Sequence, residues 1–404
     1  MALVTELSLP RIDPTDAAMR GPAYRKAMAG LEAHDGWLAA QPYGYAVLDR
    51  ESGEFFLRTR SAEFPGRTIA QLFGIDSGPL HEEIVRNIIT LSGADHARLR
   101  QLVNPALAPR RVDRYRPAMR DFLEELFSTL AGGDRRCEFV EEFAKPYPSR
   151  VIAHVMGAPI EDAARLHHFS NWIQRQFDAG SLLSERAEIE AEVAACYEYI
   201  DGLIAARRDN PREDLITDLI AAESQGDRLS HDELRNLVLN ILVGGVDTSQ
   251  SQLAHAMRLL AGAPEQWEQL RDDPEGLALR AVDEAIRYEP ITPFTARITT
   301  EELEHRGVTF PAGSVVLVSA WHANRDGIEE DAFDITADRP RARVMTFGAG
   351  IHYCVGANLA RAEIQEGLAF LAENVAEIEL DGAPEYGTPS GIYGLERLPV
   401  ILRR

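Results

Sequence analysis

The feature that most constrains the fold is one long apolar helical pattern in the second half of the chain. It begins at Ser230-His231-Asp232-Glu233, where a serine three residues before a glutamate is typical of a capping box. Apolar residues then recur with a helical period until Gly262 and Pro264, which end the pattern. About 32 residues rising 1.5 Å each give roughly 48 Å, enough to cross the whole molecule. The sequence therefore predicts a central helix around which the other elements pack.

The rest of the 404-residue chain is also predicted to be mainly helical. Residues 80–265 follow the 3.6-residue period and are divided by prolines, which indicates a succession of helices. Three segments favour β-structure instead: 41–60, expected to form a hairpin around 49–53, and about 294–320 and 378–402. No linker, repeat or low-complexity run divides the chain. We therefore expect a single domain over 1–404, mainly α with a small β-rich subdomain.

Composition and charge narrow the class of protein. The formal net charge of -22 argues against nucleic acid or an anionic membrane as a partner. Residues 1–25 lack the apolar core of a signal peptide, and no apolar run reaches the ~18 residues of a membrane span. Cys137, Cys196 and Cys354 lie far apart, without the spacing of a zinc site or a disulfide framework. We expect a cytoplasmic protein that acts as a monomer.

Cys354 lies in a glycine-rich loop that leads into a helical pattern over 357–371: Phe347-Gly348-Ala349-Gly350-Ile351-His352-Tyr353-Cys354-Val355-Gly356. The unpaired N–H groups and the positive dipole end of a starting helix favour a thiolate there. The glycines let the backbone approach something flat and bulky. A charged sulfur on such a loop indicates a haem iron ligand, and the alternative is a buried free cysteine.

Three further patterns are open to a structural or a chemical interpretation. Gly244-Gly245-Val246-Asp247-Thr248 interrupts the central helix, although each interior glycine costs about 1 kcal/mol relative to alanine. It marks either a gap that something approaches or a simple kink. Glu284 and Arg287 share one helix face, as a surface salt bridge or as a buried pair. His96 and Arg100 share another face, which by itself is an ordinary basic surface.

Taken together, these motifs resemble those of the cytochromes P-450, in the family's order and over at least residues 80–400. The resemblance implies that family's fold, with a haem b between the central and the C-terminal helices. Cys354 is then the axial ligand, and Gly244 faces the haem from the central helix. The haem is expected to be held non-covalently, because the chain has no Cys-x-x-Cys-His motif. In the loop, the resemblance assigns haem contacts to Phe347, Gly348, Gly350, His352 and Gly356.

The same resemblance implies roles for the remaining motifs. Asp247 and Thr248 deliver protons to dioxygen, because splitting an O–O bond needs positioned acid–base groups. Glu284 and Arg287 form a buried pair behind the haem loop, with Arg339 as the third member of the network. The haem propionates are bound by groups that can carry positive charge, namely His96, Arg100, Arg297 and His352.

Mapped onto this chain, the substrate pocket of the family is apolar and aromatic. The candidates are Phe73, Ile75, Ile88, Trp172, Phe177, Val243, Gly244, Ile291, Phe294, Ile392 and Tyr393. Several of these can instead be plain core residues. Because the set holds no charged anchor, it favours a lipophilic substrate, such as a terpenoid, steroid or polyketide-like molecule, over a small anionic acid.

These observations favour a monooxygenase that inserts one oxygen atom of O2 into such a substrate, by hydroxylation or epoxidation. The chain has no flavin or nicotinamide motif and no iron–sulfur cysteine set, so the electrons must come from another protein. We expect a ferredoxin fed by an NAD(P)H-dependent reductase. One alternative is a haem-thiolate peroxygenase that uses hydrogen peroxide, against which the Asp247–Thr248 pair argues. Another is a non-catalytic haem sensor or carrier.

Arginines are expected to dock the acidic ferredoxin. Seven arginines and a single acid lie between His96 and Arg120, and Arg339, Arg341 and Arg343 precede the haem loop. Arg100 and Arg339 are expected to be engaged internally. The candidates for docking are therefore Arg110, Arg111, Arg114 and Arg341. The alternative is that these arginines only balance nearby acidic residues.

Overall fold

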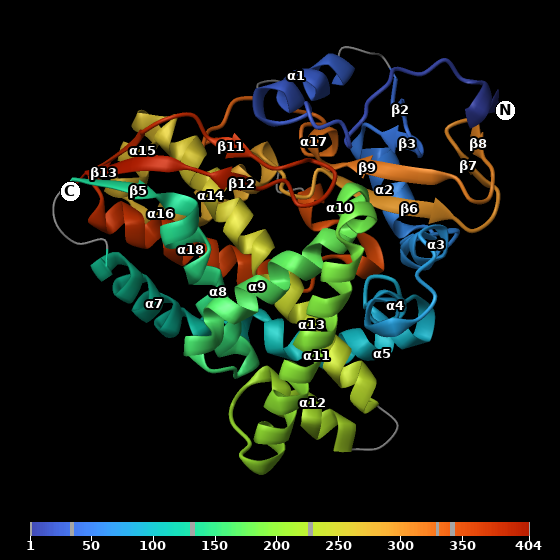
Figure 1. Cartoon of the computed structure of the whole chain (residues 1–404). Helices are drawn as coiled ribbons and strands as arrows, with labels where there is room; N and C mark the ends of the chain where they lie inside the picture. The colour runs from blue at the N-terminus through green and yellow to red at the C-terminus, as the bar shows by residue number, and fades with distance from the viewer. Residues whose placement is uncertain are drawn as a thin grey trace.

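The computed structural model describes residues 2–32, 36–129, 134–224, 229–328, 331–339 and 344–403. Helices dominate, as predicted (Figure 1). The first α-helices are α1 (Gly21–Glu32), α2 (Arg50–Arg58), α3 (Gly66–Leu72), α4 (Gly78–Arg86), α5 (Gly93–Val103), α6 (Pro109–Val112), α7 (Arg116–Thr129), α8 (Pro146–Met156) and α9 (Ala163–Gln174). They are followed by α10 (Ala179–Ser184), α11 (Arg186–Asp209), α12 (Leu215–Ser224), α13 (His231–Gly245), α14 (Asp247–Ala261), α15 (Pro264–Asp272), α16 (Pro274–Tyr288), α17 (Ala320–Ala323) and α18 (Ala357–Asn374).

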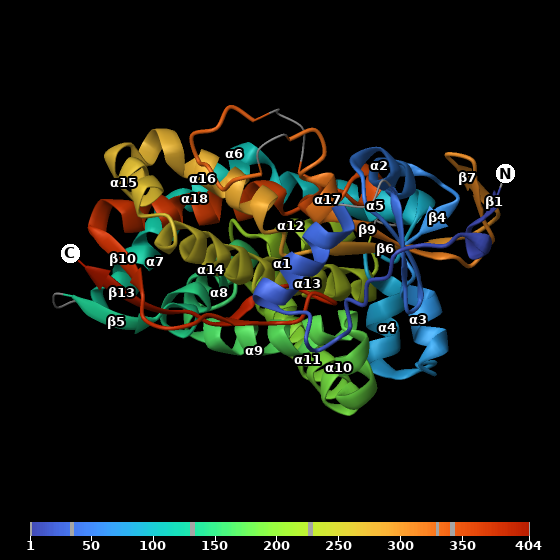
Figure 2. The same ribbon diagram turned by 90° about the horizontal axis from the view of Figure 1, so that it is seen from above.

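The β-structure forms small sheets, and the predicted strands within 294–320 and 378–402 are confirmed. The largest sheet has the order β2-β3-β9-β6-β4, in which β3 and β9 run parallel. It lies at one end of the molecule, away from α7, α15 and β13 (Figures 1 and 2). Its strands are β2 (Leu38–Gln41), β3 (Gly44–Val47), β4 (Ala62–Glu63), β6 (Phe294–Thr299) and β9 (Val315–Ser319). The smaller sheets contain β1 (Ala2–Leu3), β5 (Arg135–Glu138), β7 (Leu303–His305), β8 (Val308–Phe310), β10 (Glu377–Leu380), β11 (Glu385–Tyr386), β12 (Leu395–Arg397) and β13 (Pro399–Arg403).

The central helix is present but consists of two segments, α13 and α14. Its predicted start is confirmed, because the Ser230 hydroxyl accepts from the Glu233 N–H and the Glu233 carboxylate accepts from the Ser230 N–H at 2.8 Å. The break falls at Val246, which has φ −97° and ψ −73°. A Cβ on Gly245 would lie 2.6 Å from the side chain of Ile152 in α8, so this glycine lets α8 pack closely beside the break.

The predicted hairpin over 41–60 is wrong, because its expected turn at 49–53 is the start of helix α2. Strands β2 and β3 do form a hairpin, with Gln41 opposite Gly44, but the following segment is α2 rather than a strand. The Asp49 carboxylate accepts from the Ser52 N–H at 2.7 Å and caps this helix. Phe56 and Leu57 are buried on one helix face together with Ser52. The adjacent residues Phe55, Phe56 and Leu57 are of types that are common in strands, whereas the cap and the one-sided burial specify a helix.

The C-terminal half of the chain completes the frame of the site. Helix α14 packs against α16 and α18, and α16 packs against α18. Helix α18 starts directly after the predicted haem loop. Because α18 packs against α14, the loop is brought toward the break in the central helix. Within the described ranges, no helix combines the length and the apolar character that crossing a bilayer requires.

Candidate active site

A cavity of about 1050 Å³ lies beside the break in the central helix. The central helix contributes Gly244, Gly245 and Thr248 to its wall. The predicted haem loop contributes residues 346–349, 352 and 354–356, and the chain far from these motifs adds 14–15 and 390–392. The cavity therefore collects residues from nearly the whole length of the protein.

The loop before α18 is held in a shape that only glycine can support. The Cys354 N–H donates to the Phe347 carbonyl oxygen at 2.9 Å and closes the loop. Gly348 and Gly350 have φ values of +69° and +71°, in the left-handed region that side chains disfavour. A Cβ on Gly350 would also lie 2.5 Å from the Leu57 carbonyl oxygen. The loop therefore has to contain glycine where the sequence places it.

The Cys354 sulfur lines the cavity at the start of α18. Burial raises the pKa of this thiol, and the backbone N–H groups of Gly356 and Ala357 act in the opposite direction. The positive charges of Arg100 and Arg361 also lower it. Donors and cations around a sulfur stabilise the thiolate once a metal replaces the proton.

Four groups that can carry positive charge gather near this loop: His96, Arg100, Arg297 and His352. The rings of His96 and His352 have centroids 4.4 Å apart. Arg100 donates to the Tyr353 carbonyl oxygen at 2.8 Å. His96 Nε2 is buried and has no hydrogen-bond partner among the described residues. Within the same residues, neither Arg100 nor Arg297 has a carboxylate partner.

Burial and the nearby positive charges lower the pKa values of groups in this cluster. Burial lowers the pKa of Arg297 to about 10. Burial, followed by the charges of His96, Arg297 and Arg100, lowers the pKa of His352 to about 3. Buried cations without counter-charges are costly, so the cluster is suited to an anionic group that brings carboxylates.

The geometry of the cavity fits a haem. A haem carries two propionates, which match the unpaired cations around His96. The glycine-rich loop places Cys354, a candidate metal ligand, on the cavity wall beside Gly348 and Gly356. A Cβ on Gly244 would meet nothing within 4 Å, so the central helix presents bare backbone to the open space. These features agree with a flat macrocycle lying between the central helix and the Cys354 loop.

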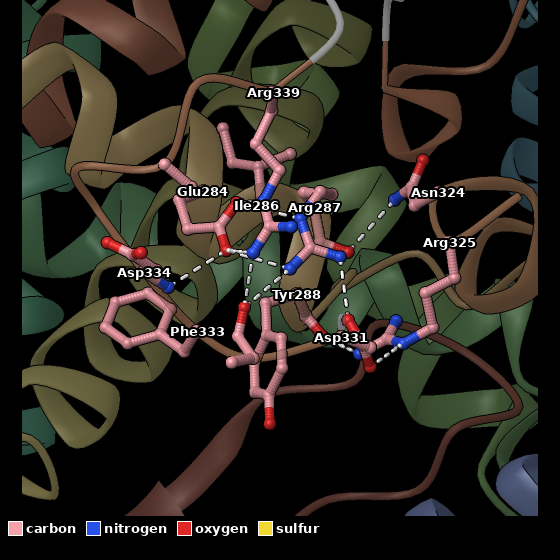
Figure 3. A network of polar contacts seen from close by, with 12 residues as sticks. Glu284, Ile286, Arg287, Tyr288, Asn324, Arg325, Asp331, Phe333, Asp334 and Arg339 are labelled. Atoms are coloured by element: carbon pink, nitrogen blue, oxygen red, sulfur yellow. Dashed lines mark hydrogen bonds and ion pairs between the residues drawn. The ribbon is translucent and has the colours of Figure 1, made fainter. Parts of the chain in front are cut away.

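Glu284 and Arg287 form a buried pair, as the resemblance implied (Figure 3). Their side chains are 5 % and 6 % exposed, and two hydrogen bonds of 2.8 Å join them. Arg339 approaches the same carboxylate at 3.1 and 3.3 Å. The Asp334 N–H donates to Glu284 at 3.1 Å, and Arg287 extends to Asp331 at 2.9 Å. Burial opposes the charge of Arg287, but its bonds to Glu284 and Asp331 raise its pKa.

Thr248 and Asp247 point in different directions from the break. Thr248 lines the cavity, and its hydroxyl donates to the Gly244 carbonyl oxygen at 2.6 Å. Asp247 is buried away from the cavity, where it accepts from the Ser170 hydroxyl at 2.5 Å and from the Asn171 amide at 3.5 Å. Burial raises its pKa, which the bond from Ser170 and the charge of His167 counteract. The Asp247 carboxylate therefore lies behind the part of the cavity wall to which Thr248 belongs.

Comparison with known proteins identifies the family. The family model described as cytochrome P450 matches residues 46–275 and 277–374. Luteothin monooxygenase of Streptomyces thioluteus is 33% identical over 90% of this chain and 89% of that protein. Mycinamicin IV hydroxylase/epoxidase of Micromonospora griseorubida is 36% identical over 75% of this chain and 76% of that protein. The crystal structure of CalO2 has a TM-score of 0.89 at 29% identity and covers 98% of this chain and 99% of that one.

The chain belongs to the cytochrome P450 family. It is a monooxygenase with the P450 fold, as predicted, and its family implies a haem-thiolate cofactor, O2, a small-molecule substrate and a redox partner.

Several predicted pocket residues line the P450 cavity. They are Phe73, Phe177, Gly244, Ile291, Phe294 and Ile392. Val243 and Tyr393 do not line it, which corrects their assignment. Val243 is buried in the main hydrophobic core cluster. Tyr393 is buried in a core cluster with Tyr24. Ile75, Ile88 and Trp172 likewise belong to the packed core or its edge rather than to the cavity.

Other cavity residues escaped the sequence analysis. Asn240, Ile241, Ser249 and Gln252 extend the face of the P450 central helix that Gly244 marks, and helical spacing from Gly244 could have found them. The N-terminal contributions, Pro14, Thr15, Gln41 and Tyr43, carry no motif. They come to the cavity through tertiary packing, which no local pattern announces.

Two of the four predicted docking arginines, Arg111 and Arg114, are paired with acids, as are Arg116 and Arg120 of the same segment. Arg111 and Arg114 both contact Glu213, at 2.9 and 2.7 Å. Arg116 and Arg120 contact Glu366 at 2.6 and 2.5 Å. Arg341 and Arg343 lie outside the described residues. Arg110 is exposed on α6 and forms no ion pair within the part of the chain that the structure describes.

Proposed function

We propose that this P450 binds haem b non-covalently, with the Cys354 thiolate as the axial ligand. The observation that carries the proposal is the position of the Cys354 sulfur on the cavity wall, beside unpaired buried cations. When bound, a haem thiolate supplies the iron centre at which dioxygen is activated. The chain's own contribution is to hold that group and to stabilise the thiolate through the N–H groups of Gly356 and Ala357.

The propionates are proposed to pair with His96, Arg100, Arg297 and His352. Each carboxylate would then supply the partner that His96 Nε2 and Arg297 lack among the described residues. Phe347, Gly348, Gly350 and Gly356 would contact the macrocycle, since all but Gly350 line the cavity and Gly350 fixes the turn between them.

Proton delivery is proposed to use Thr248 at the cavity and Asp247 behind it. The Thr248 hydroxyl is anchored on the carbonyl that the helix break leaves free, so it is positioned to exchange a proton with groups in the cavity. Asp247 holds and releases protons on the other side of the break, through its contact with Ser170. This pair supports a monooxygenase rather than a sensor or a peroxygenase.

The substrate is proposed to be an uncharged lipophilic molecule, such as a polyketide-like compound. No aspartate, glutamate or lysine of the described residues lines the cavity, and Arg297 is assigned to the haem. The polar lining consists of hydroxyls and amides such as Thr68, Gln174, Asn240 and Ser390. One similar protein, the Bacillus subtilis P450 PksS, carries a bacillaene polyketide synthase in its name and has a TM-score of 0.84 at 25% identity.

The electron donor is proposed to be an acidic ferredoxin that docks on the face formed by α6 and the haem loop. Helix α6 packs against α18, which begins just after Cys354. Arg110 projects from α6, and Ile351 of the loop is 59% exposed. A charged rim and an exposed apolar residue near the metal suit a transient partner.

The test is the absorbance of the reduced carbon-monoxide complex. The wild type should show the red-shifted Soret band of thiolate ligation, and Cys354→His should lose it while Cys137→Ala, a thiol remote from the cavity, keeps it. A shifted band that persists in Cys354→His would remove Cys354 as the ligand.

A further inference from the structure

Exposed apolar side chains mark an opening of the cavity to solvent. Tyr43, Leu72 and Leu183 all line the cavity, yet they are between 65% and 78% exposed. They come from the β2–β3 turn, α3 and α10. Single exposed apolar residues are common on proteins, but these three share the wall of one cavity. Helix α10 therefore borders a mouth through which ligands can pass.

The chain around α10 is held together by its own contacts. Arg175 and Glu185, one on each side of the helix, form an ion pair at 2.8 Å. Asp178 Oδ1 accepts from the Ser181 N–H at 2.8 Å and caps the first turn of the helix. Residues 175–185, which we call the α10 segment, therefore form one local unit, and part of this unit lines the cavity.

A hairpin loop from the C-terminal part of the chain supplies another part of the wall. Residues 387–394 join β11 to β12, and a backbone hydrogen bond of 2.9 Å connects the first and the last residue of this loop. Residues 390–392 at its tip line the cavity. On one side, the Tyr393 N–H holds the loop to the Ile291 carbonyl oxygen at 2.8 Å.

A hydrogen bond joins the tip of this loop to the α10 segment. The Ser390 hydroxyl donates to Asp178 Oδ2, the carboxylate oxygen that the helix cap does not use. A Cβ on Gly391 would lie 3.7 Å from the Cβ of Asp178, so the loop passes directly beside the aspartate. Among the described residues, no other hydrogen bond joins the loop to the α10 segment. Asp178 therefore connects two parts of the wall that are 212 residues apart in the sequence.

We infer that the hydrogen bond between Asp178 and Ser390 is a latch at the mouth of the cavity, which limits the size of the lipophilic molecules that pass in and out. The inference rests on the proposed function of the cavity as the haem and substrate site. It gives a role in ligand selection to Asp178, which is not among the described residues of the cavity wall. We call this contact the Asp178–Ser390 latch.

The latch should act on rates rather than on affinity. It can stay closed both in the free protein and around a bound ligand, whereas the passage of a bulky ligand requires the loop tip and α10 to separate. Loss of the latch therefore stabilises the open state relative to both closed states. The association and dissociation rates should rise together, and the dissociation constant, which is their ratio, should stay the same. A ligand small enough to pass through the closed mouth should keep its rates.

The experiment uses the ferric holoenzyme and two azoles that bind haem iron, 1-tritylimidazole and imidazole. The phenyl rings of the first need a wide passage, whereas the second is a single small ring. Association and dissociation rates are measured by stopped flow from the Soret shift. Ser390→Ala and Asp178→Ser remove the latch from opposite sides, and a serine at position 178 can still cap α10. Ser184→Ala is the matched control, because Ser184 is an exposed serine of α10 whose hydroxyl donates to the Gly180 carbonyl oxygen at 3.0 Å.

Both latch variants should raise the two rates of 1-tritylimidazole about tenfold, the equivalent of one hydrogen bond to a charged group, and should leave its dissociation constant within about twofold of the wild type. The double variant should be no faster than either single variant, because the same contact is lost. Ser390→Thr, which keeps a hydroxyl, and Ser184→Ala should follow the wild type. The rates of imidazole should be the same in every protein.

Unchanged rates of 1-tritylimidazole in the latch variants would overturn the inference, since the ligand would then pass elsewhere. A change confined to the dissociation rate of Ser390→Ala would also overturn it, because Ser390 would then only contact the bound ligand from the cavity wall. Either single variant decides the question if the other does not fold. Failure of imidazole itself to shift the Soret band would count against the proposed haem site, and the inference would fall with it.

Discussion

Replacing Glu284 by alanine should prevent stable haem binding. The carboxylate accepts hydrogen bonds from Arg287 at 2.8 and 2.8 Å, from Arg339 at 3.1 and 3.3 Å, and from the Asp334 N–H at 3.1 Å. Its removal leaves Arg287 with Asp331 and the Ala332 carbonyl, and Arg339 with the same carbonyl. The segment over 331–339, which leads toward the haem loop, then loses the bonds from Asp334 and Arg339 to α16, and its contacts with Arg287 and Arg280 of that helix remain.

The magnitude follows from the burial of the pair. Breaking a buried pair on one side costs about 3–5 kcal/mol, because the remaining charge stays buried. A protein domain is stable by only about 5–15 kcal/mol, so the loss is a large share of the total. Glu284→Gln should fall between alanine and wild type, because the amide oxygen still accepts but the charge is gone.

The assay measures haem content per protein and the midpoint of thermal unfolding, side by side. Glu275→Ala is the matched control, since Glu275 is an exposed glutamate in the first turn of the same helix. That variant should change stability by less than about 1 kcal/mol, the usual size of a helix-dipole contribution. If Glu284→Ala keeps full haem content and unfolds together with Glu275→Ala, the network is not what holds the haem loop.

Four further substitutions test other parts of the protein. Thr248→Ala should uncouple the reaction, so that more hydrogen peroxide and less product are released for each NAD(P)H consumed. Asp247→Asn should slow turnover and increase its solvent isotope effect. Normal coupling and a normal rate in both variants would exclude the pair from proton delivery. Arg110→Glu should slow reduction by a ferredoxin and weaken the salt dependence of that step without altering azole binding; a reduction rate unaffected by either change places the docking face elsewhere. Burial raises the pKa of Glu363 from 4.5 to about 8, so its protonated form contributes to the stability of the folded state. This contribution is fully present below pH 4.5 and is lost as the pH rises through 8. It amounts to at most about 5 kcal/mol, at about 1.36 kcal/mol per pH unit. Glu363→Gln should therefore gain in thermal midpoint over the wild type between pH 6 and 9, and parallel curves would show that the carboxyl is not held protonated.

Local chemistry explains which parts of the fold the sequence predicted. The capping box at Ser230 and the glycines at 348 and 350 are short-range signals, and the structure confirms both. The strand predicted after Asp49 was wrong because the capping carboxylate outweighed the neighbouring apolar residues Phe55, Phe56 and Leu57. Local signals therefore decide an element when they satisfy backbone N–H groups.

The cavity was harder to predict because side-chain direction depends on tertiary packing. Val243 and Gly244 are neighbours on a helix, so they point about 100° apart and only one faces the cavity. Ile392 and Tyr393 lie in a tight turn, in which the Gly394 N–H donates to the Ile392 carbonyl oxygen at 3.0 Å, and again only one of the two lines the cavity. Because only one residue of each pair faces the cavity, predicting both as pocket residues was wrong for one of them.

The meeting of residues 14–15 and 390–392 at one cavity has a consequence for how the protein is made. A growing chain emerges from the ribosome from its N-terminus, so the wall that contains residues 390–392 is missing until almost all other elements have been synthesised. Strand β13, which joins β5 to β10, is later still. A cofactor that arrives before residues 390–392 have been synthesised therefore meets a cavity that is still open on one side, and these residues complete the wall afterwards.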